Sequence, residues 1–367
     1  MQATLYQIAA RHRPREFAPT LLSDFTTDGG TSVDPGIIAT DPQWSLYAFD
    51  LDQDRAIFVR LPHGTDLSTA PFIMTMQFQT AEQVLTLPLD ALLPLSETLP
   101  QPANLVLLFS IGRSGTTLAN HILNMVPGTF GLSEPRAFIP LVFARDTMAP
   151  DRAQAMITAA TRFLFRPPQG TAPHTFAIKF HSQILCQAEL FHRAFPQARF
   201  VFMYRDAHGW ANSTSQFLQN LGEPLLIDHA RLLGAWNMST ANAPLETLAR
   251  YVDVGAPLSP HAPLLAAIWA ESIAEYQHSL ALGVPFLALR YNELNTDRLA
   301  ATRALLGHCG LSTDHAEAAL AAFDRDSQEG TAIGRGGNVI RLASADYALI
   351  DATLARHDPP LSSDIRL

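Results

Sequence analysis

The sequence predicts an α/β protein: a three-layer core, in which helices cover both faces of a parallel sheet, with a small β-rich subdomain in front of it. From residue 105 onward, short apolar runs typical of buried strands alternate with helical patterns, as in parallel α/β sheets. Residues 1–100 show hairpin patterns instead. A hydrophobic share of 47% over 367 residues is ample for a large core.

A proline-rich junction divides these two parts. Pro100 and Pro102 mark the boundary, so we expect a β-rich N-terminal subdomain of unknown role at 1–100 and the main domain at 101–367. The N-terminal sheet would pack on the main domain or form an arm for dimerisation, which makes a homodimer one expected assembly.

The N-terminal part contains four predicted strands. Two of them, Trp44–Phe49 and Ala56–Arg60, flank a polar turn at 52–55, which is a hairpin signal. The segments Phe72–Gln79 and Val84–Leu87 are apolar enough to form two more strands. In the main domain the clearest helix is Pro263–Leu282, with Gly283 directly behind it as the residue that ends the helix.

The most informative segment begins with the apolar run Leu105–Phe109, which fits a buried strand. A tight loop with two glycines and Arg113 follows, and a helical pattern begins at Thr116. Loop N–H groups and the helix dipole favour a negative ligand at such a place. Arg113 adds a positive fork that matches phosphate or sulfate oxygens. The sequence therefore predicts an anion site.

This loop differs from the common nucleotide-binding loops. A Walker A loop needs G-x-x-x-x-G-K-[ST], but Gly112 and Gly115 are too close together and Thr116 stands in place of the lysine. A nucleophile elbow needs G-x-S-x-G, and residues 112–116 do not match it because Thr116 stands where the last glycine should be. The dinucleotide fingerprint G-x-G-x-x-G is also missing here. The segment is thus P-loop-like in layout without being a Walker loop.

A second segment has a comparable layout. The apolar run Phe200–Tyr204 fits a buried strand and ends at Arg205. Asp206 is a suitable N-cap for a following helix. Ser213 lies two helical turns further on, on the face that looks back toward the end of the strand. An arginine and a hydroxyl group are therefore expected to face the same place.

The two segments, R-S-G-T-T after a strand and R-D-x₆-S after another, resemble the cofactor motifs of sulfotransferases that use 3′-phosphoadenosine-5′-phosphosulfate (PAPS). The likeness extends to bacterial, tyrosylprotein and cytosolic members. It implies a P-loop-like fold and transfer of a sulfuryl group to a hydroxyl or amine of a small-molecule, carbohydrate or lipid acceptor. The product would be 3′-phosphoadenosine-5′-phosphate (PAP), with no metal required. The implied cofactor residues are Gly112, Arg113, Ser114, Gly115, Thr116, Thr117, Arg205 and Ser213.

The resemblance supplies two candidates for the base that removes the acceptor proton. Lys179-Phe180-His181 is similar to the Lys-Thr-His of cytosolic members, in which the lysine touches the transferring group and the histidine takes the proton. Phe180 departs from that pattern. Glu134 lies about twenty residues after the loop, as the proposed base of tyrosylprotein and many bacterial members does. Both residues stay open, together with Lys179 and Arg113 as further catalytic residues.

Two later segments complete the resemblance. Tyr291 follows the predicted strand Val284–Arg290, and its family counterpart contacts the adenine, although Asn292 replaces an acid of the family pattern. Arg335 and Gly336 belong to a Gly-rich segment similar to the one that closes over the 3′-phosphate. The helix-rich stretch between the motifs is expected to form the lid of the acceptor pocket.

Composition narrows the function further. A net charge of −9 disfavours a general nucleic-acid binder. Two cysteines give neither a disulfide framework nor a metal quartet. No apolar run reaches the ~20 residues of a membrane span, so a cytoplasmic protein is expected. A P-loop small-molecule kinase and a non-catalytic nucleotide-binding protein remain the alternatives; the missing lysine and the presence of Lys179, His181 and Glu134 speak against them.

Overall fold

The computed structural model describes residues 2–13, 19–220, 222, 224, 226–324 and 341–367. The chain forms two compact units, and each is described by itself. Unit 1 comprises Met1–Leu107, Leu123–Phe180 and Leu190–Arg199. Unit 2 comprises Leu108–Ile122, His181–Glu189 and Phe200–Leu367. The domain boundary expected near residue 100 stays a prediction.

The predicted α/β core is present as a five-stranded sheet. Its strand order is β13-β10-β7-β9-β8. β8 pairs in parallel with β9, and β10 pairs in parallel with β13. The expectation of a parallel sheet is therefore confirmed. The strands are β7 (Asn104–Ser110), β8 (Thr129–Ser133), β9 (Thr175–Lys179), β10 (Arg199–Tyr204) and β13 (Phe286–Arg290).

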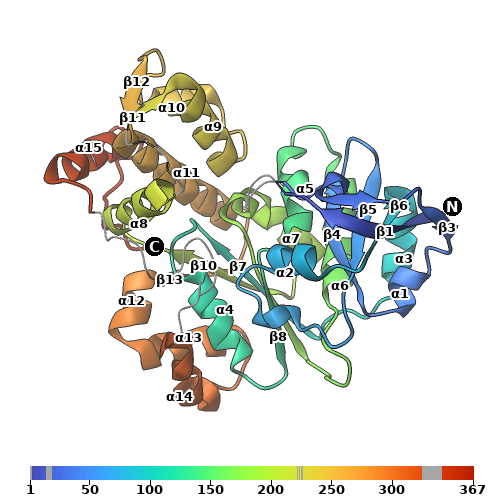
Figure 1. The fold of residues 1–367 in the computed structure, drawn as a ribbon. Helices are drawn as coiled ribbons and strands as arrows, with labels where there is room; N and C mark the ends of the chain where they lie inside the picture. The colour runs from blue at the N-terminus through green and yellow to red at the C-terminus, as the bar shows by residue number, and fades with distance from the viewer. Residues whose placement is uncertain (1, 14–18, 221, 223, 225, 325–340) are drawn as a thin grey trace. The chain divides into compact units, whose positions relative to one another are not determined.

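Unit 1 contains the predicted β-rich subdomain as an antiparallel sheet, drawn in blue in Figure 1. The strand order is β2-β1-β6-β5-β4, and β3 pairs with β1. The hairpin expected around residues 52–55 is the β4–β5 pair. The strands are β1 (Ala3–Arg11), β2 (Phe25–Thr27), β3 (Thr31–Val33), β4 (Trp44–Asp50), β5 (Arg55–Arg60) and β6 (Gln83–Pro88).

The prediction of a strand at Phe72–Gln79 is wrong, because this segment forms the helix α2 (Ile73–Thr80). A short apolar run does not by itself distinguish a strand from a buried helix. Here tertiary packing decides: the buried Gln77 side chain donates to Ser45 Oγ at 2.8 Å and to Leu46 O at 3.0 Å. Ile73 and Gln77 are buried one helical turn apart.

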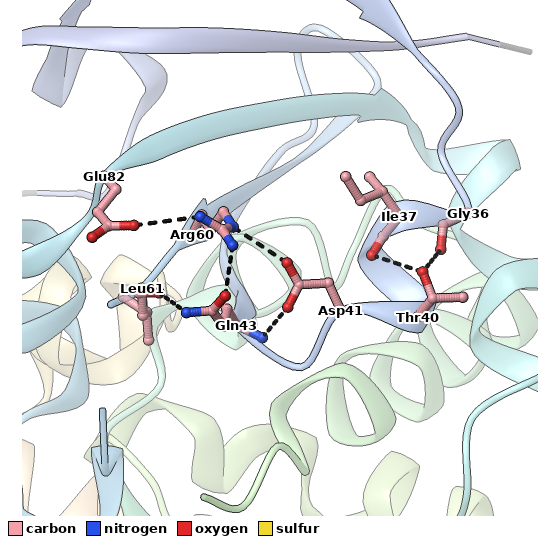
Figure 2. A network of polar contacts seen from close by, with 8 residues as sticks. All are labelled: Gly36, Ile37, Thr40, Asp41, Gln43, Arg60, Leu61 and Glu82. Atoms are coloured by element: carbon pink, nitrogen blue, oxygen red, sulfur yellow. Dashed lines mark hydrogen bonds and ion pairs between the residues drawn. The ribbon is translucent and has the colours of Figure 1, made fainter. Parts of the chain in front are cut away.

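A polar network at the edge of this sheet ties β5 to the segment before β4 (Figure 2). Arg60 Nε donates to Asp41 Oδ2 at 3.2 Å, and Arg60 Nη2 donates to Gln43 Oε1 at 2.6 Å. Glu82 accepts from Arg60 Nη1 at 3.5 Å. These groups are partly exposed, where ion pairs contribute about 0–1 kcal/mol each. The network fixes the geometry of the hairpin end more than it stabilises the fold.

Helices cover the sheets within each unit. In unit 1, Phe163 of α6 packs edge-on against Phe58 of β5, with ring centroids 5.0 Å apart. The helices other than α2 with residues in unit 1 are α1 (Ile37–Thr40), α3 (Leu89–Glu97), α5 (Ile139–Phe143), α6 (Pro150–Leu164) and α7 (Ala188–Ala194).

In unit 2, the predicted long helix is present as α11 (His261–Ala281), and Gly283 behind it has φ +87°. Tyr276 of α11 stacks on Phe202 of β10, with ring centroids 4.2 Å apart. Neither α11 nor any other helix in the described part of the chain is long and apolar enough to cross a membrane.

In unit 2, α8 (Ala207–Asn220), α9 (His229–Thr240) and α15 (Ser344–Leu354) pack against α11 (Figure 1). Helix α13 (Arg298–His308) packs against β13, and α14 (Ala316–Ala319) packs against α13. The other elements with residues in unit 2 are α4 (Thr116–Asn124), α10 (Leu245–Ala249), α12 (Tyr291–Thr296), β11 (Leu226–Asp228) and β12 (Leu258–Pro260).

Candidate functional site

The loop between β7 and α4 has a sharply turned backbone. Gly112, Arg113 and Gly115 have φ of +71°, +47° and +83°. The left-handed conformation costs a non-glycine residue such as Arg113 roughly 1–2 kcal/mol. Contacts on the protein side hold the turn: Ser114 Oγ donates to Met203 O at 3.0 Å, and Gly112 N donates to Ser110 Oγ at 3.1 Å. The loop thus has a defined shape at the N-terminus of α4.

Helix α8 binds the carbonyl groups of this loop. The indole Nε1 of Trp210 donates to Ile111 O at 3.0 Å and to Gly112 O at 3.1 Å. Two acceptors of the loop are therefore occupied by the protein. The first N–H groups of α4 have no partner within the helix, as at any helix start, and Thr116 and Thr117 are buried there. The local electrostatics favour an anion.

The structure brings the two predicted motifs together. Arg113 Nε donates to Ser213 Oγ at 3.3 Å, although the two residues are 100 positions apart in the sequence. The Arg113 guanidinium also lies over the ring of Phe217, 5.6 Å from its centroid. Both motifs therefore contribute to one polar cluster in unit 2.

Arg205 lies at the end of β10, as predicted. Its backbone carbonyl accepts a hydrogen bond from Trp269 Nε1 at 3.0 Å, and its guanidinium lies 4.9 Å from the ring centroid of Tyr291. The Arg205 Nε is buried and has no hydrogen-bond partner among the described residues. A buried N–H without an acceptor is costly. This guanidinium is thus arranged for an anionic ligand.

Tyr291, at the start of α12, lies against both the loop and Arg205. A Cβ at Gly115 would meet the Tyr291 ring at 2.5 Å, so this glycine is required for space as well as for its positive φ. The departure at Asn292 also has a reason. Its amide donates to Asp206 Oδ2 at 3.0 Å, and Asp206 Oδ1 caps α8 by accepting from Gly209 N at 2.7 Å. An acid at 292 would repel Asp206.

One more sequence-predicted residue, His181, belongs to unit 2. His181 follows β9 at the N-cap position of a short 3₁₀ helix, η4 (Ser182–Gln187), and is partly buried. A Cβ at Gly112 would lie 3.6 Å from Ser182, so the segment that carries His181 runs beside the loop. Arg335 and Gly336 lie outside the described residues.

In unit 1, Glu134 and Lys179 form an ion pair. The Lys179 ammonium contacts Glu134 Oε1, and Glu134 N donates to Lys179 O at 2.7 Å. The side chains are 4% and 14% exposed for Lys179 and Glu134, so water hardly screens the pair. The Lys179 ammonium also lies 5.6 Å from the ring centroid of Phe72. Glu134 has φ +55°, a strained conformation for a glutamate.

The packing of Phe180 explains why this chain departs from the Lys-Thr-His pattern at the position between Lys179 and His181. The Phe180 ring is 1% exposed and packs against Phe138 and Phe191, with ring centroids 5.4 Å and 4.7 Å away. An aromatic residue here belongs to the core of unit 1, where a small polar side chain would leave a cavity.

Sequence reasoning missed several residues that hold the unit 2 cluster. Trp210, Trp269 and Phe217 contact the loop, Arg205 and Arg113 respectively. A tryptophan four residues after the N-cap Asp206 was a usable signal, because a buried indole N–H needs an acceptor. Trp269 and Phe217 had no such signal.

No family model and no curated protein matches the sequence. Solved structures match in fold at low scores. The sulfotransferase from Alicyclobacillus acidocaldarius is 14% identical with a TM-score of 0.40, and the match covers 70% of this chain and 94% of that one. The sulfotransferase STF9 from Mycobacterium avium is 15% identical with a TM-score of 0.42, over 72% and 79%.

Retinol dehydratase, solved with androsterone and the inactive cofactor PAP, is 13% identical with a TM-score of 0.36, over 73% and 84% of the two chains. Identities of 13–15% and TM-scores of this size carry no argument about the activity of the present chain.

Proposed function

We propose that this protein is a PAPS-dependent sulfotransferase that transfers a sulfuryl group to a hydroxyl or amine of a small-molecule, carbohydrate or lipid acceptor. The observation that carries the proposal is the unit 2 cluster. Arg113 of the loop contacts Ser213 of the second motif, and Arg205 in the same unit keeps a buried N–H that has no acceptor among the described residues. Two arginines at a helix N-terminus fit a ligand with more than one anionic group.

The residues present fit PAPS. The loop amides, Arg113 and the hydroxyls of Thr116 and Thr117 suit the sulfate and the 5′-phosphate. Arg205 and Ser213 suit the 3′-phosphate, and Tyr291 suits the adenine. Arg335 and Gly336 are assigned to the 3′-phosphate by the family resemblance alone. When bound, PAPS supplies the sulfuryl group and leaves as PAP.

The protein side chains take defined roles in this reaction. Sulfuryl transfer is an in-line displacement similar to phosphoryl transfer, so the protein acts by positioning and by stabilising charge. Arg113 stabilises the negative charge that develops on the leaving oxygen, and Lys179 supplies a second positive charge. Glu134 or His181 accepts the proton from the acceptor.

The decisive experiment incubates the protein with labelled PAPS and an acceptor library and detects sulfated products by mass spectrometry. Arg113→Ala should lower kcat/KM by about 30-fold or more, which corresponds to about 2 kcal/mol of transition-state stabilisation. Arg303→Ala, on the exposed face of α13, is the matched control and should behave like wild type. Phosphorylated products from a parallel ATP reaction would instead support a kinase. No sulfated product together with no PAP binding would refute the proposal.

A further inference from the structure

The C-terminal segment, defined as residues 362–367, is bound where β10 ends and α8 begins. Ala207 N, at the first position of α8, donates to Ser363 O at 2.8 Å. An N–H at a helix start has no partner within its own helix, so the segment supplies the missing acceptor. Leu367 N donates to the hydroxyl of Tyr204, the last residue of β10, at 3.0 Å. The C-terminal segment therefore fixes both ends of the short connection between β10 and α8.

An ion pair attaches the same segment to β13. The guanidinium of Arg290, the last residue of β13, pairs with Asp364. The Arg290 side chain is 5% exposed, whereas that of Asp364 is 75% exposed. Burial opposes the charge of Arg290, but the hydrogen bond and the charge of Asp364, the largest favourable contributions, bring the pKa of Arg290 above its ordinary value. A buried charge that loses its partner is costly, so this pair ties the segment to the end of β13.

These attachments flank two residues that the proposed function assigns to the nucleotide. Arg205 directly follows Tyr204, and Tyr291 directly follows Arg290. The Arg205 guanidinium lies 4.9 Å from the ring centroid of Tyr291, and its buried Nε has no acceptor among the described residues. The direction of this guanidinium therefore depends on the backbone at the ends of β10 and β13 and on the Tyr291 ring. The C-terminal segment holds both strand ends at once.

We propose that Asp364 is a positioning residue for the 3′-phosphate of the donor. Through its ion pair with Arg290 it keeps the C-terminal segment across the ends of β10 and β13, and so keeps Arg205 directed at the phosphate. Asp364 is an acid and would repel a phosphate, so it acts through Arg290 and does not touch the ligand. The inference rests on the proposed function and adds to its 3′ site a residue that lies outside both sequence motifs.

Binding of two nucleotides separates this role from a purely structural one. PAP and adenosine 5′-monophosphate (AMP) differ only in the 3′-phosphate, so calorimetric titration with both isolates the contribution of that group. Asp364→Asn removes the charge and keeps the size of the side chain. It should weaken PAP at least about tenfold and change AMP affinity less than about twofold. An equal loss for both nucleotides, or no loss for either, would overturn the inference.

The matched control is Arg366→Gln on the same segment. Arg366 forms an exposed ion pair with Glu293 at 3.7 Å, and exposed pairs contribute little, so this variant should keep both affinities. If it loses the preference for PAP as Asp364→Asn does, the effect is not specific to the pair with Arg290 and the inference is wrong. Asp364→Glu keeps the negative charge and should restore part of the preference.

A double-mutant cycle tests whether Asp364 acts through Arg290. If it does, Arg290→Gln alone and Arg290→Gln combined with Asp364→Asn should lose the preference for PAP to the same extent, because Asp364 has no further effect once its partner is absent. Losses that add in the double variant would give Asp364 a separate role and contradict the inference.

Failure of this inference and failure of the proposed function give different results. Sulfate transfer and selective PAP binding that persist unchanged in Asp364→Asn refute the positioning role alone. Selective PAP binding that Asp364→Asn removes, in a protein that transfers no sulfate, refutes the sulfotransferase and leaves the positioning role standing. A wild-type protein that binds PAP no better than AMP refutes the 3′ site and this inference with it.

Discussion

Two residues with predicted chemistry, Arg113 and Glu134, have left-handed backbone conformations, with φ of +47° and +55°. Outside glycine such conformations cost roughly 1–2 kcal/mol each and persist only where the surroundings impose them. At Glu134 the pairing of its backbone N–H with Lys179 O imposes the turn, and its carboxylate meets the Lys179 ammonium. Strain at this residue fixes the direction of one carboxylate.

The first prediction distinguishes the two candidate bases. Glu134→Gln or His181→Asn should lower kcat by about 100-fold or more with a near-normal PAP dissociation constant, because loss of a base affects the proton step and not cofactor binding. We favour Glu134, since Phe180 interrupts the histidine pattern with a core side chain.

The pH profile checks that assignment independently. Activity falls at low pH as the base becomes protonated, so this acidic limb should vanish in the variant that lacks the base. Retention of wild-type kcat by both variants across the pH range would leave the mechanism without a proton acceptor.

A second prediction concerns Arg205. The protein should prefer PAPS to adenosine-5′-phosphosulfate, which lacks the 3′-phosphate, by about two orders of magnitude, because the buried Arg205 Nε–H would be left without an acceptor. Arg205→Ala should lower this ratio, mainly by lowering kcat/KM for PAPS. Steady-state kcat/KM values for both donors measure it, and an unchanged ratio in the variant would place the 3′ site elsewhere.

At the scale of elements, the first turn of α8 organises much of the unit 2 cluster. Asp206 caps the helix, Gly209 leaves room for the Arg205 guanidinium, and Trp210 binds the loop carbonyls. A Cβ at Gly209 would lie 2.6 Å from Arg205 Nε and 2.8 Å from Asp206 Oδ2. The absence of one methyl group at this helix start therefore sets the position of the arginine.

Gly209→Ala should weaken PAP binding at least about tenfold, because Arg205 must move away from its present position. Gly234→Ala in α9 is the matched control. A Cβ at Gly234 would meet nothing within 4 Å. This variant should therefore keep its PAP affinity, and its higher helix propensity should stabilise the protein by up to about 1 kcal/mol. Calorimetric titration with PAP measures both variants. Wild-type affinity in Gly209→Ala would show that Arg205 does not bind the cofactor.

At the scale of the whole molecule, a chain of net charge −9 still has cationic side chains at the positions where the proposed chemistry needs them. Arg113 and Arg205 lie in unit 2, and Lys179 lies in unit 1, where it pairs with Glu134. The net charge of the chain is therefore a poor guide to the charge of its ligand, because interactions between distant exposed charges are screened within about 10 Å.

Sulfate transfer should survive chelation by EDTA. The loop has Thr116 where a magnesium-dependent Walker loop has lysine, and a sulfuryl group carries one charge rather than the two of a phosphoryl group. In the described part of the chain no three His, Cys, Asp or Glu side chains gather as a metal site. The rate with EDTA is compared with the rate in added Mg²⁺; a loss that Mg²⁺ restores would contradict the assignment.

Local patterns predicted the local features well. The buried strands around 105–109 and 200–204, the cap at Asp206 and the glycine at 283 all follow from apolar runs and backbone preferences that neighbouring residues set. The segment Phe72–Gln79 went wrong because its apolar run fits either element, and the hydrogen bonds of Gln77 to β4 select the helix.

The sequence by itself determined the fold class, the loop that is predicted to bind an anion and the candidate residues, because each depends on contiguous residues. Only the tertiary structure decided which residues meet. Arg113 reaches Ser213, and Lys179 pairs with Glu134. The physical reason is that strand order and helix packing, which join segments 45 to 100 residues apart, place charges in or out of reach of each other.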